Sequence, residues 1–191
     1  ATLSTVEAVA SQVFIPLTVA GGVSKLQDIE RLLEKGADKV SINTSAILDP
    51  SLVGNAAKKF GSQCIVVAVD SKREGEKSYV YTHGGKNKTA FETSAWIKIV
   101  EGEGAGEILL TSMDRDGTKI GFDNELTSSI AKDLSIPLIT SGGAGSIDHM
   151  IEGITDGKAD AVLAASIFHQ KEITIAEVKD GLASKGIEVR L

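Results

Sequence analysis

A carboxylate follows directly on an apolar run near the middle of the chain. Residues 64–69 (CIVVAV) are all apolar, and Asp70 comes next. A continuous apolar run of this length is typical of a strand buried on both faces of a parallel sheet. A carboxylate at the end of such a strand is partly desolvated, which suits general acid–base catalysis. Asp70 is therefore a candidate catalytic residue. The alternative is a cap, or an ion-pair partner for Lys72 or Arg73.

Two Gly-Gly pairs follow the same kind of apolar segment in different parts of the chain. Residues 15–22 read IPLTVAGG and residues 136–143 read IPLITSGG, an offset of 121. Further on, ADKV at 37–40 recurs as ADAV at 159–162, an offset of 122. The alternative is that common turn sequences recur by chance. Two separate matches whose offsets differ by only one residue favour an internal repeat. The predicted half-barrel repeat spans residues 15–44 and 136–166.

Each copy of this repeat predicts a phosphate site. Glycine lets backbone N–H groups approach an anion, and a following helix N-terminus adds its positive end. In each copy the next strand ends in a hydroxyl residue, Thr44 (beside Asn43) or Ser166. Adjacent strand ends converge in a barrel, so Gly22 and Gly143 would lie near these hydroxyls. Two such sites imply an elongated ligand with a phosphate at each end; a tight turn without a ligand is the alternative.

Other charged residues are placed by the direction of the expected strands. The loop 111–119 (TSMDRDGTK) offers carboxylates, hydroxyls and a glycine past a strand end, although a solvated Asp-Gly turn would look the same. Asp38, Lys39 and Glu107 instead begin their strands, at the opposite, amino-terminal face. Charges there are usually stabilising or docking contacts in barrel enzymes.

Strands and helices alternate along the whole chain. The expected strands are 15–20, 38–43, 64–69, 107–112, 136–141 and 160–165. Helices are expected near 3–12, after Gly22 with a Ser24/Gln27 capping box, from Asp49-Pro50 to Gly61, at 93–101 and 123–133, after Ser146 and at 174–184, with a polar hairpin-like segment near 78–89. This order predicts an α/β fold with a parallel sheet covered by helices.

The open alternative is a doubly wound sheet, and the closed one is a (β/α) barrel. No Gly-x-Gly-x-x-Gly follows a strand, and polar residues follow several different strands, which favours the barrel. Two strand–helix units separate the repeat copies, whereas only a helix precedes the first. We therefore expect a single domain over 1–191 that is a six-strand, incomplete TIM-type barrel, units 3–8 of a (β/α)8 barrel.

Composition excludes several classes of function. The net charge is −6 with no basic block, which argues against a nucleic-acid or membrane-surface partner. The single cysteine, Cys64, fits a reducing compartment, and no signal-peptide or membrane-spanning pattern is present, so a cytoplasmic protein is expected. His83, His149 and His169 lack metal-ligand spacing, and we expect neither a metal nor a cofactor.

Five segments together resemble the cyclase subunit family of imidazole glycerol phosphate synthase, from histidine biosynthesis. They are residues 37–44 (ADKVSINT), 60–70 (FGSQCIVVAVD), 104–118 (GAGEILLTSMDRDGT), 141–145 (SGGAG) and 164–169 (AASIFH). The resemblance runs through the chain to Leu191. The isomerase of the same pathway shares the barrel and the Gly-Gly ends but not this set of segments. It is the alternative enzyme interpretation.

The resemblance implies an enzyme that uses ammonia and a bis-phosphorylated formimino aminoimidazole carboxamide ribonucleotide to form imidazole glycerol phosphate. Asp70 matches one of the family's two catalytic aspartates. The other carried-over residues are Gly22, Asn43 and Thr44 for one phosphate, Gly117, Gly143, Ala165 and Ser166 for the other, and Asp116 as a substrate contact. Lys39 and Glu107 match half of the gate that admits ammonia from the glutaminase subunit, on the face where Asp38 also lies.

The resemblance also exposes a departure. The family's first strand, first helix and second strand have no counterpart in these residues, and the first-strand aspartate is among what is lacking. The chain alone is therefore expected to turn over slowly and to self-associate through strands 15–20 and 160–165, because open sheet edges favour association. A non-catalytic phosphate-ligand-binding fragment is the alternative from another class.

Overall fold

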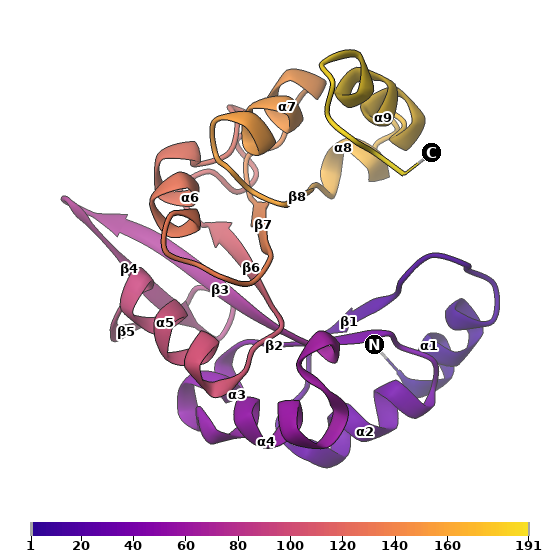
Figure 1. Ribbon diagram of the computed structural model, residues 1–191, viewed down its shortest axis with the longest axis vertical. Coiled ribbons are helices and arrows are strands. Elements are labelled where there is room, and N and C mark those ends of the chain that lie inside the picture. Colours follow the sequence, from indigo (N-terminus) through magenta and orange to yellow (C-terminus); the bar gives the residue numbers. More distant parts are fainter. Residues whose placement is uncertain (1, 191) are drawn as a thin grey trace.

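The sheet contains six parallel strands that curl around one side of the molecule, with helices on the outer side (Figure 1). The computed structural model describes residues 2–190, so the first and last residues of the expected domain lie outside the described residues. The six strands follow the order β1-β2-β3-β6-β7-β8, and each consecutive pair is parallel. Within the described residues, β1 and β8 are the two ends of this path and no pairing joins them. The expected incomplete (β/α) barrel is confirmed.

The elements have these bounds. The strands are β1 Thr18–Ala20, β2 Lys39–Ile42, β3 Ile65–Glu74, β4 Lys77–Thr82, β5 Asn87–Glu92, β6 Glu107–Ser112, β7 Leu138–Ser141 and β8 Ala161–Leu163. The helices are α1 Leu3–Ala10, α2 Leu26–Glu34, α3 Thr44–Leu48, α4 Ser51–Phe60, the 3-10 turn η1 Ser62–Cys64, α5 Thr93–Glu103, α6 Asn124–Ala131, α7 Ile147–Thr155, α8 Ser166–His169 and α9 Ile175–Ser184.

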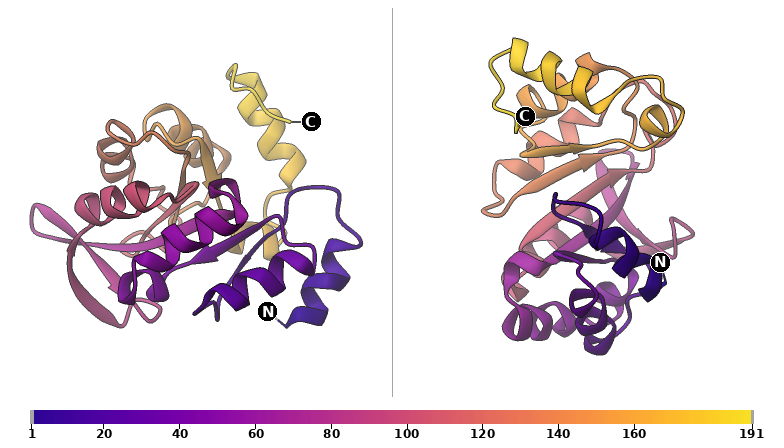
Figure 2. Two further views of the ribbon diagram at one scale, coloured as in Figure 1. Left: turned by 60° about the horizontal axis from the view of Figure 1, so that its bottom comes forward. Right: turned by 90° about the vertical axis from the view of Figure 1, so that its right-hand side faces the viewer.

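Strand β3 is longer than the apolar run that predicted it. Its first part pairs with β6, from Val66 opposite Glu107 to Ser71 opposite Ser112. Its second part leaves the barrel and pairs antiparallel with β4, which returns as β5. This hairpin extends away from the sheet (Figure 2). Asp70 lies where β3 passes from barrel strand to hairpin, so it is at the mouth of the barrel but inside a continuous strand.

The core lies between the outer face of the sheet and the helices. Alternate strand residues such as Val40, Ile108 and Leu110 are buried there, against Trp96 and Ile97 of α5. A smaller cluster joins α7, α8 and α9 through Met150, Ile167, Val178 and Leu182. This separation leaves the other set of alternate residues, including Asp70, on the inner face.

No helix within residues 2–190 is long and apolar enough to cross a membrane.

The capping box predicted at Ser24 and Gln27 is wrong. Helix α2 begins one residue later, with Lys25 as its N-cap, and Asp28 supplies the carboxylate. One oxygen, Asp28 Oδ2, accepts hydrogen bonds from Ser24 N at 3.0 Å and Lys25 N at 3.1 Å. A carboxylate captures these free N–H groups better than a neutral amide does, and this contact lowers the pKa of Asp28.

Strands β1 and β7 also begin later than predicted, and they begin in the same way. The preceding prolines, Pro16 and Pro137, have no N–H to donate. The next backbone N–H is taken by a side chain. Leu17 N donates to Asp38 Oδ2 at 2.7 Å, and Leu138 N donates to Asp160 Oδ2 at 2.9 Å. The Asp38 carboxylate at the amino-terminal face therefore ties β1 to the start of β2.

A similar carboxylate contact ties α5 to the connection before β7. Glu101 Oε1 accepts from Ser135 N at 2.7 Å and Ser135 Oγ at 2.6 Å, and Glu101 Oε2 accepts from Lys98 Nζ at 3.0 Å. The Ser135 hydroxyl and N–H, followed by the Lys98 contact, lower the pKa of Glu101 from 4.5 to about 2.

This contact predicts an acid-sensitive contribution to stability. Because the pKa of Glu101 is depressed in the folded state, its contribution is present above pH 4.5 and is lost as pH falls toward about 2. At pH 7, Glu101→Gln is expected to lower the free energy of unfolding by roughly 1–2 kcal/mol. Urea unfolding at several pH values checks this. A difference from wild type that fails to shrink below pH 4.5 would contradict the assignment.

Candidate functional site

The Asp70 carboxylate lies at the carboxyl end of the sheet beside Asn43, the residue that follows β2. Asn43 Nδ2 donates to Asp70 Oδ2 at 3.0 Å. Asn43 Oδ1 is buried, and within residues 2–190 it has no hydrogen-bond partner. The amide therefore orients Asp70 with one end and leaves an acceptor at the other. A substrate group that donates a hydrogen bond would satisfy it.

Burial raises the pKa of Asp70 above its ordinary value of 3.8. The hydrogen bond from Asn43 opposes this rise, and the negative charge of Asp116 adds to it. A raised pKa brings a carboxyl closer to the range in which it both gives up and takes back a proton. Met113 N donates to Ser71 O at 2.8 Å, so the loop after β6 begins beside Asp70 at the barrel mouth.

The raised pKa predicts that ionised Asp70, the form present at pH 7, destabilises the fold. The folded state holds the Asp70 proton more tightly than the unfolded state, so stability is lost as pH rises from 3.8 through the folded-state pKa. At pH 7, Asp70→Asn is expected to stabilise the fold by roughly 0.5–1 kcal/mol, a small gain because the residue is only partly buried. Thermal unfolding at pH 7 and below pH 3.8 checks this, because the gain should vanish at the lower pH. Destabilisation at pH 7 would show that Asp70 is a structural carboxylate.

A pocket of about 160 Å³ lies at the ends of β7 and β8. All five residues predicted for the second phosphate site and its neighbouring loop line this pocket: Asp116, Gly117, Gly143, Ala165 and Ser166. They come from three segments far apart in the sequence. The tertiary structure thus brings these predicted residues together in a cavity of the size that one small polar group occupies.

The glycines of this pocket are required by close backbone packing. Gly142 and Gly143 have φ values of 92° and 104°, in the region that disfavours other residues. A Cβ on Gly143 would lie 2.2 Å from the carbonyl oxygen of Gly121, and one on Gly142 would lie 2.6 Å from that of Ser112. Gly121 N also donates to Gly143 O at 2.8 Å. The loop after β6 therefore rests directly on the Gly-Gly turn.

The glycine of the first predicted phosphate site is less closely packed than that of the second. Gly22 has a φ of 73°, and a Cβ there would have no atom within 4 Å. Ser45 Oγ donates to Val23 O at 2.7 Å, which holds the turn after Gly22 against the start of α3. Thr44 Oγ1 accepts from His83 N of the hairpin at 3.0 Å, so its hydroxyl is already partnered. Gly22, Asn43 and Thr44 thus follow the neighbouring ends of β1 and β2, and the space beside Gly22 is open.

At the opposite end of the sheet, Lys39 and Glu107 form an ion pair. Their side chains are 28% and 17% exposed, so the pair is substantially shielded from solvent. These are the two residues matched to the ammonia gate, and they occupy the amino-terminal ends of β2 and β6. The pair therefore bridges two strands that are separated in the sheet by β3.

Two of the polar residues that line the second pocket were given no role in the sequence analysis. Ser141 is buried at the end of β7, and Lys119 approaches the pocket from the loop after β6. Period-two alternation with Ile139 is the signal that would have placed Ser141 on the inner face. Lys119 carried no comparable signal, because its approach depends on how the loop folds.

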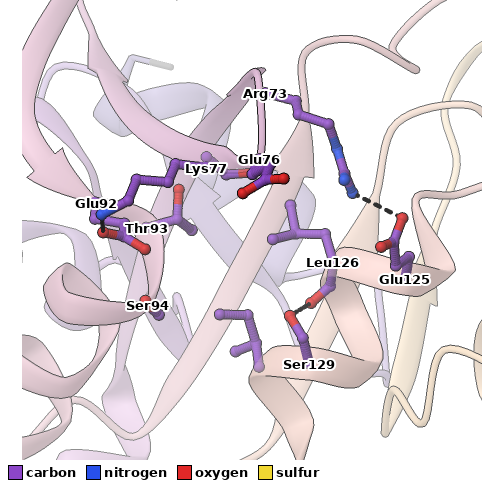
Figure 3. A pocket seen from close by; sticks show the side chains of 11 residues that line it. Arg73, Glu76, Lys77, Glu92, Thr93, Ser94, Glu125, Leu126 and Ser129 are labelled. Carbon is purple, nitrogen blue, oxygen red and sulfur yellow. Dashed lines mark hydrogen bonds and ion pairs between the residues drawn. The ribbon is translucent and has the colours of Figure 1, made fainter.

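Another cavity, of about 230 Å³, lies between the hairpin and α6 (Figure 3). None of the predicted site residues lines it. Four of its five charged groups are paired: Arg73 Nη2 lies 3.2 Å from Glu125 Oε2, and Lys77 Nζ lies 3.0 Å from Glu92 Oε2 (Figure 3). The fifth is Glu76, so the lining carries more negative than positive charge and offers no net attraction to an anionic substrate. Among residues 2–190, no cluster of three His, Cys, Asp or Glu side chains could hold a metal ion.

Comparison with known families decides the broad class. The family model described as "Histidine biosynthesis protein" matches residues 1–174. The chain belongs to this histidine biosynthesis family. Its members are barrel enzymes of histidine biosynthesis, which agrees with the strand–helix order and with a site at the carboxyl ends of the strands. The matched range, 1–174, spans the positions of Asp70 and of both predicted phosphate sites.

Proposed function

We propose that this chain is the cyclase component of imidazole glycerol phosphate synthase. In this reaction ammonia and the bis-phosphorylated formimino aminoimidazole carboxamide ribonucleotide give imidazole glycerol phosphate, aminoimidazole carboxamide ribonucleotide and water; the water carries the ketone oxygen that the ammonia nitrogen replaces. The observation that carries the proposal is the position of Asp70. It is a carboxylate of raised pKa, oriented by Asn43 at 3.0 Å, and electrostatically coupled to Asp116 beside the second pocket.

Each part of the site has a task in this scheme. The second pocket holds one phosphate of the substrate through the backbone of Gly143 and the Ser166 hydroxyl. The edge formed by Gly22, Asn43 and Thr44 takes the other phosphate. The ribonucleotide then lies across the barrel mouth, over Asp70, which moves a proton during attack by ammonia and ring closure. Ammonia enters past Lys39 and Glu107, on the face where a glutaminase subunit docks.

The test is an assay of the purified 191-residue chain with this substrate and ammonium at alkaline pH, following loss of the substrate chromophore. Slow but measurable formation of imidazole glycerol phosphate is expected. Acid–base catalysis contributes about 10²–10⁴-fold per group, and these residues contain one of the family's two matched aspartates. Turnover of an aminoaldose isomer instead, with no dependence on ammonium, would identify the sister isomerase and overturn the proposal.

A binding role without turnover is the second candidate. It is favoured by one observation: the second pocket is formed within these residues, whereas a single matched carboxylate serves the chemistry. Substrate affinity in the micromolar range without product would select this candidate.

Because β1 and β8 leave open edges, we also propose self-association, which light scattering at micromolar concentration tests. A monodisperse monomer would contradict it.

A further inference from the structure

Among the described residues, Lys119 is the one cationic side chain that lines the second pocket. Its ammonium group pairs with a carboxylate outside the pocket lining. Its Nζ lies 2.5 Å from Glu172 Oε1 and 3.4 Å from Gln170 Oε1. Neither Glu172 nor Gln170 lines the pocket. The other charged residue in the lining is Asp116. With Lys119 paired to Glu172, the pocket therefore presents a net negative charge to an incoming anion.

Both ends of this ion pair are anchored to the walls of the pocket. Lys119 has a φ of 58°, unusual for a residue with a side chain. Its backbone packs on Gly145, where a Cβ would lie 2.6 Å from the Lys119 carbonyl oxygen. On the other side, Gln170 N donates to Ser166 O at 2.8 Å and Glu172 N donates to Ile167 O at 2.9 Å. The backbone at both ends of the pair thus makes contacts of its own, so the two side chains can separate without breaking them.

The pair itself is weak enough to exchange. The side chains of Lys119 and Glu172 are 39% and 38% exposed, and ion pairs at such exposed sites are held by little free energy. A phosphate bound in the pocket would carry more negative charge than one carboxylate. It would also be surrounded by the residues that line the pocket, of which Lys119 is one.

We propose that Lys119 is a phosphate-binding residue that exchanges between Glu172 in the empty pocket and the phosphate in the occupied one. Glu172 acts as the competing acceptor and so sets the affinity of the pocket. This inference rests on the proposed phosphate role of the pocket and adds a specific cation and its competitor to it.

Titration with inorganic phosphate, followed through the backbone amide resonances of Gly143 and Ser166 at fixed ionic strength, tests the exchange. Lys119→Gln is expected to weaken phosphate binding by about tenfold or more. Glu172→Gln is expected to tighten it by about 2- to 5-fold, because the competitor is removed. In the double variant the Glu172 substitution should have no further effect. Lys171→Gln, at an exposed lysine beside Glu172, is the charge-matched control and should bind as wild type does.

The outcomes separate the two ideas. If wild type shows no phosphate-dependent shift at Gly143 and Ser166, the phosphate role of the pocket fails, and the exchange fails with it. If wild type binds but Lys119→Gln binds equally well, the exchange is wrong and the pocket stands. Weaker binding by Glu172→Gln would also overturn the exchange, because it would mean that the ion pair holds the pocket in shape.

Discussion

Replacing Asp70 by asparagine is expected to lower ammonia-dependent turnover by about 10²–10⁴-fold, the usual contribution of a positioned acid–base group. Asparagine has nearly the same shape and still accepts a hydrogen bond from Asn43, so the geometry at 3.0 Å should survive. It has no proton to exchange. The loss should therefore fall on kcat, with substrate affinity within a few-fold of wild type. Initial rates over a range of substrate concentrations measure both quantities.

The matched control for this variant is Asp180→Asn, on the exposed side of α9. It removes the same charge at a position without a role in the site, and it should leave turnover unchanged. If thermal unfolding shows that Asp70→Asn is at least as stable as wild type at pH 7, a loss of activity is not due to unfolding. Equal turnover by the Asp70 variant and wild type would remove Asp70 from the chemistry.

Replacing Gly143 by alanine is expected to have the largest effect on the fold and on the second pocket. The substitution combines a φ of 104° with a Cβ 2.2 Å from the Gly121 carbonyl oxygen. Left-handed backbone costs about 1–2 kcal/mol and overpacking about 1–3 kcal/mol, so a loss of roughly 2–5 kcal/mol is expected. The loop after β6 must move to relieve the contact. Phosphate binding at this pocket should weaken accordingly.

Gly22→Ala provides a comparison at the corresponding position of the first repeat. Gly22 has a φ of 73°, but its Cβ would meet no atom within 4 Å. Only the backbone term applies, so a loss of about 1–2 kcal/mol is expected. Urea unfolding of both variants measures the difference. If the two substitutions were equally destabilising, backbone strain alone would explain both. The contact between a Cβ on residue 143 and the loop would then add nothing to the loss of unfolding free energy.

Much of this fold is visible in the sequence because it rests on local patterns. Apolar runs separated by helical periodicity predicted six strands, and β6 begins and ends where expected, at Glu107 and Ser112. The N-cap at Ser146 was also predicted, and its side chain accepts from His149 N. Element starts were less accurate at β1, β7 and α2. There the decisive partners, Asp38, Asp160 and Asp28, supply carboxylates whose choice of N–H depends on the folded backbone.

The candidate site divides in the same way. By itself the sequence determined that Asp70 ends an apolar strand and that glycines and hydroxyls recur at matching strand ends, because the direction of parallel strands fixes which residues reach the barrel mouth. Tertiary structure alone decided that Asn43 orients Asp70, that the residues of the second phosphate site line one pocket, and that Lys119 pairs with Glu172. Those relations join segments up to 53 residues apart. They depend on how loops pack against one another, for which a local pattern carries no signal.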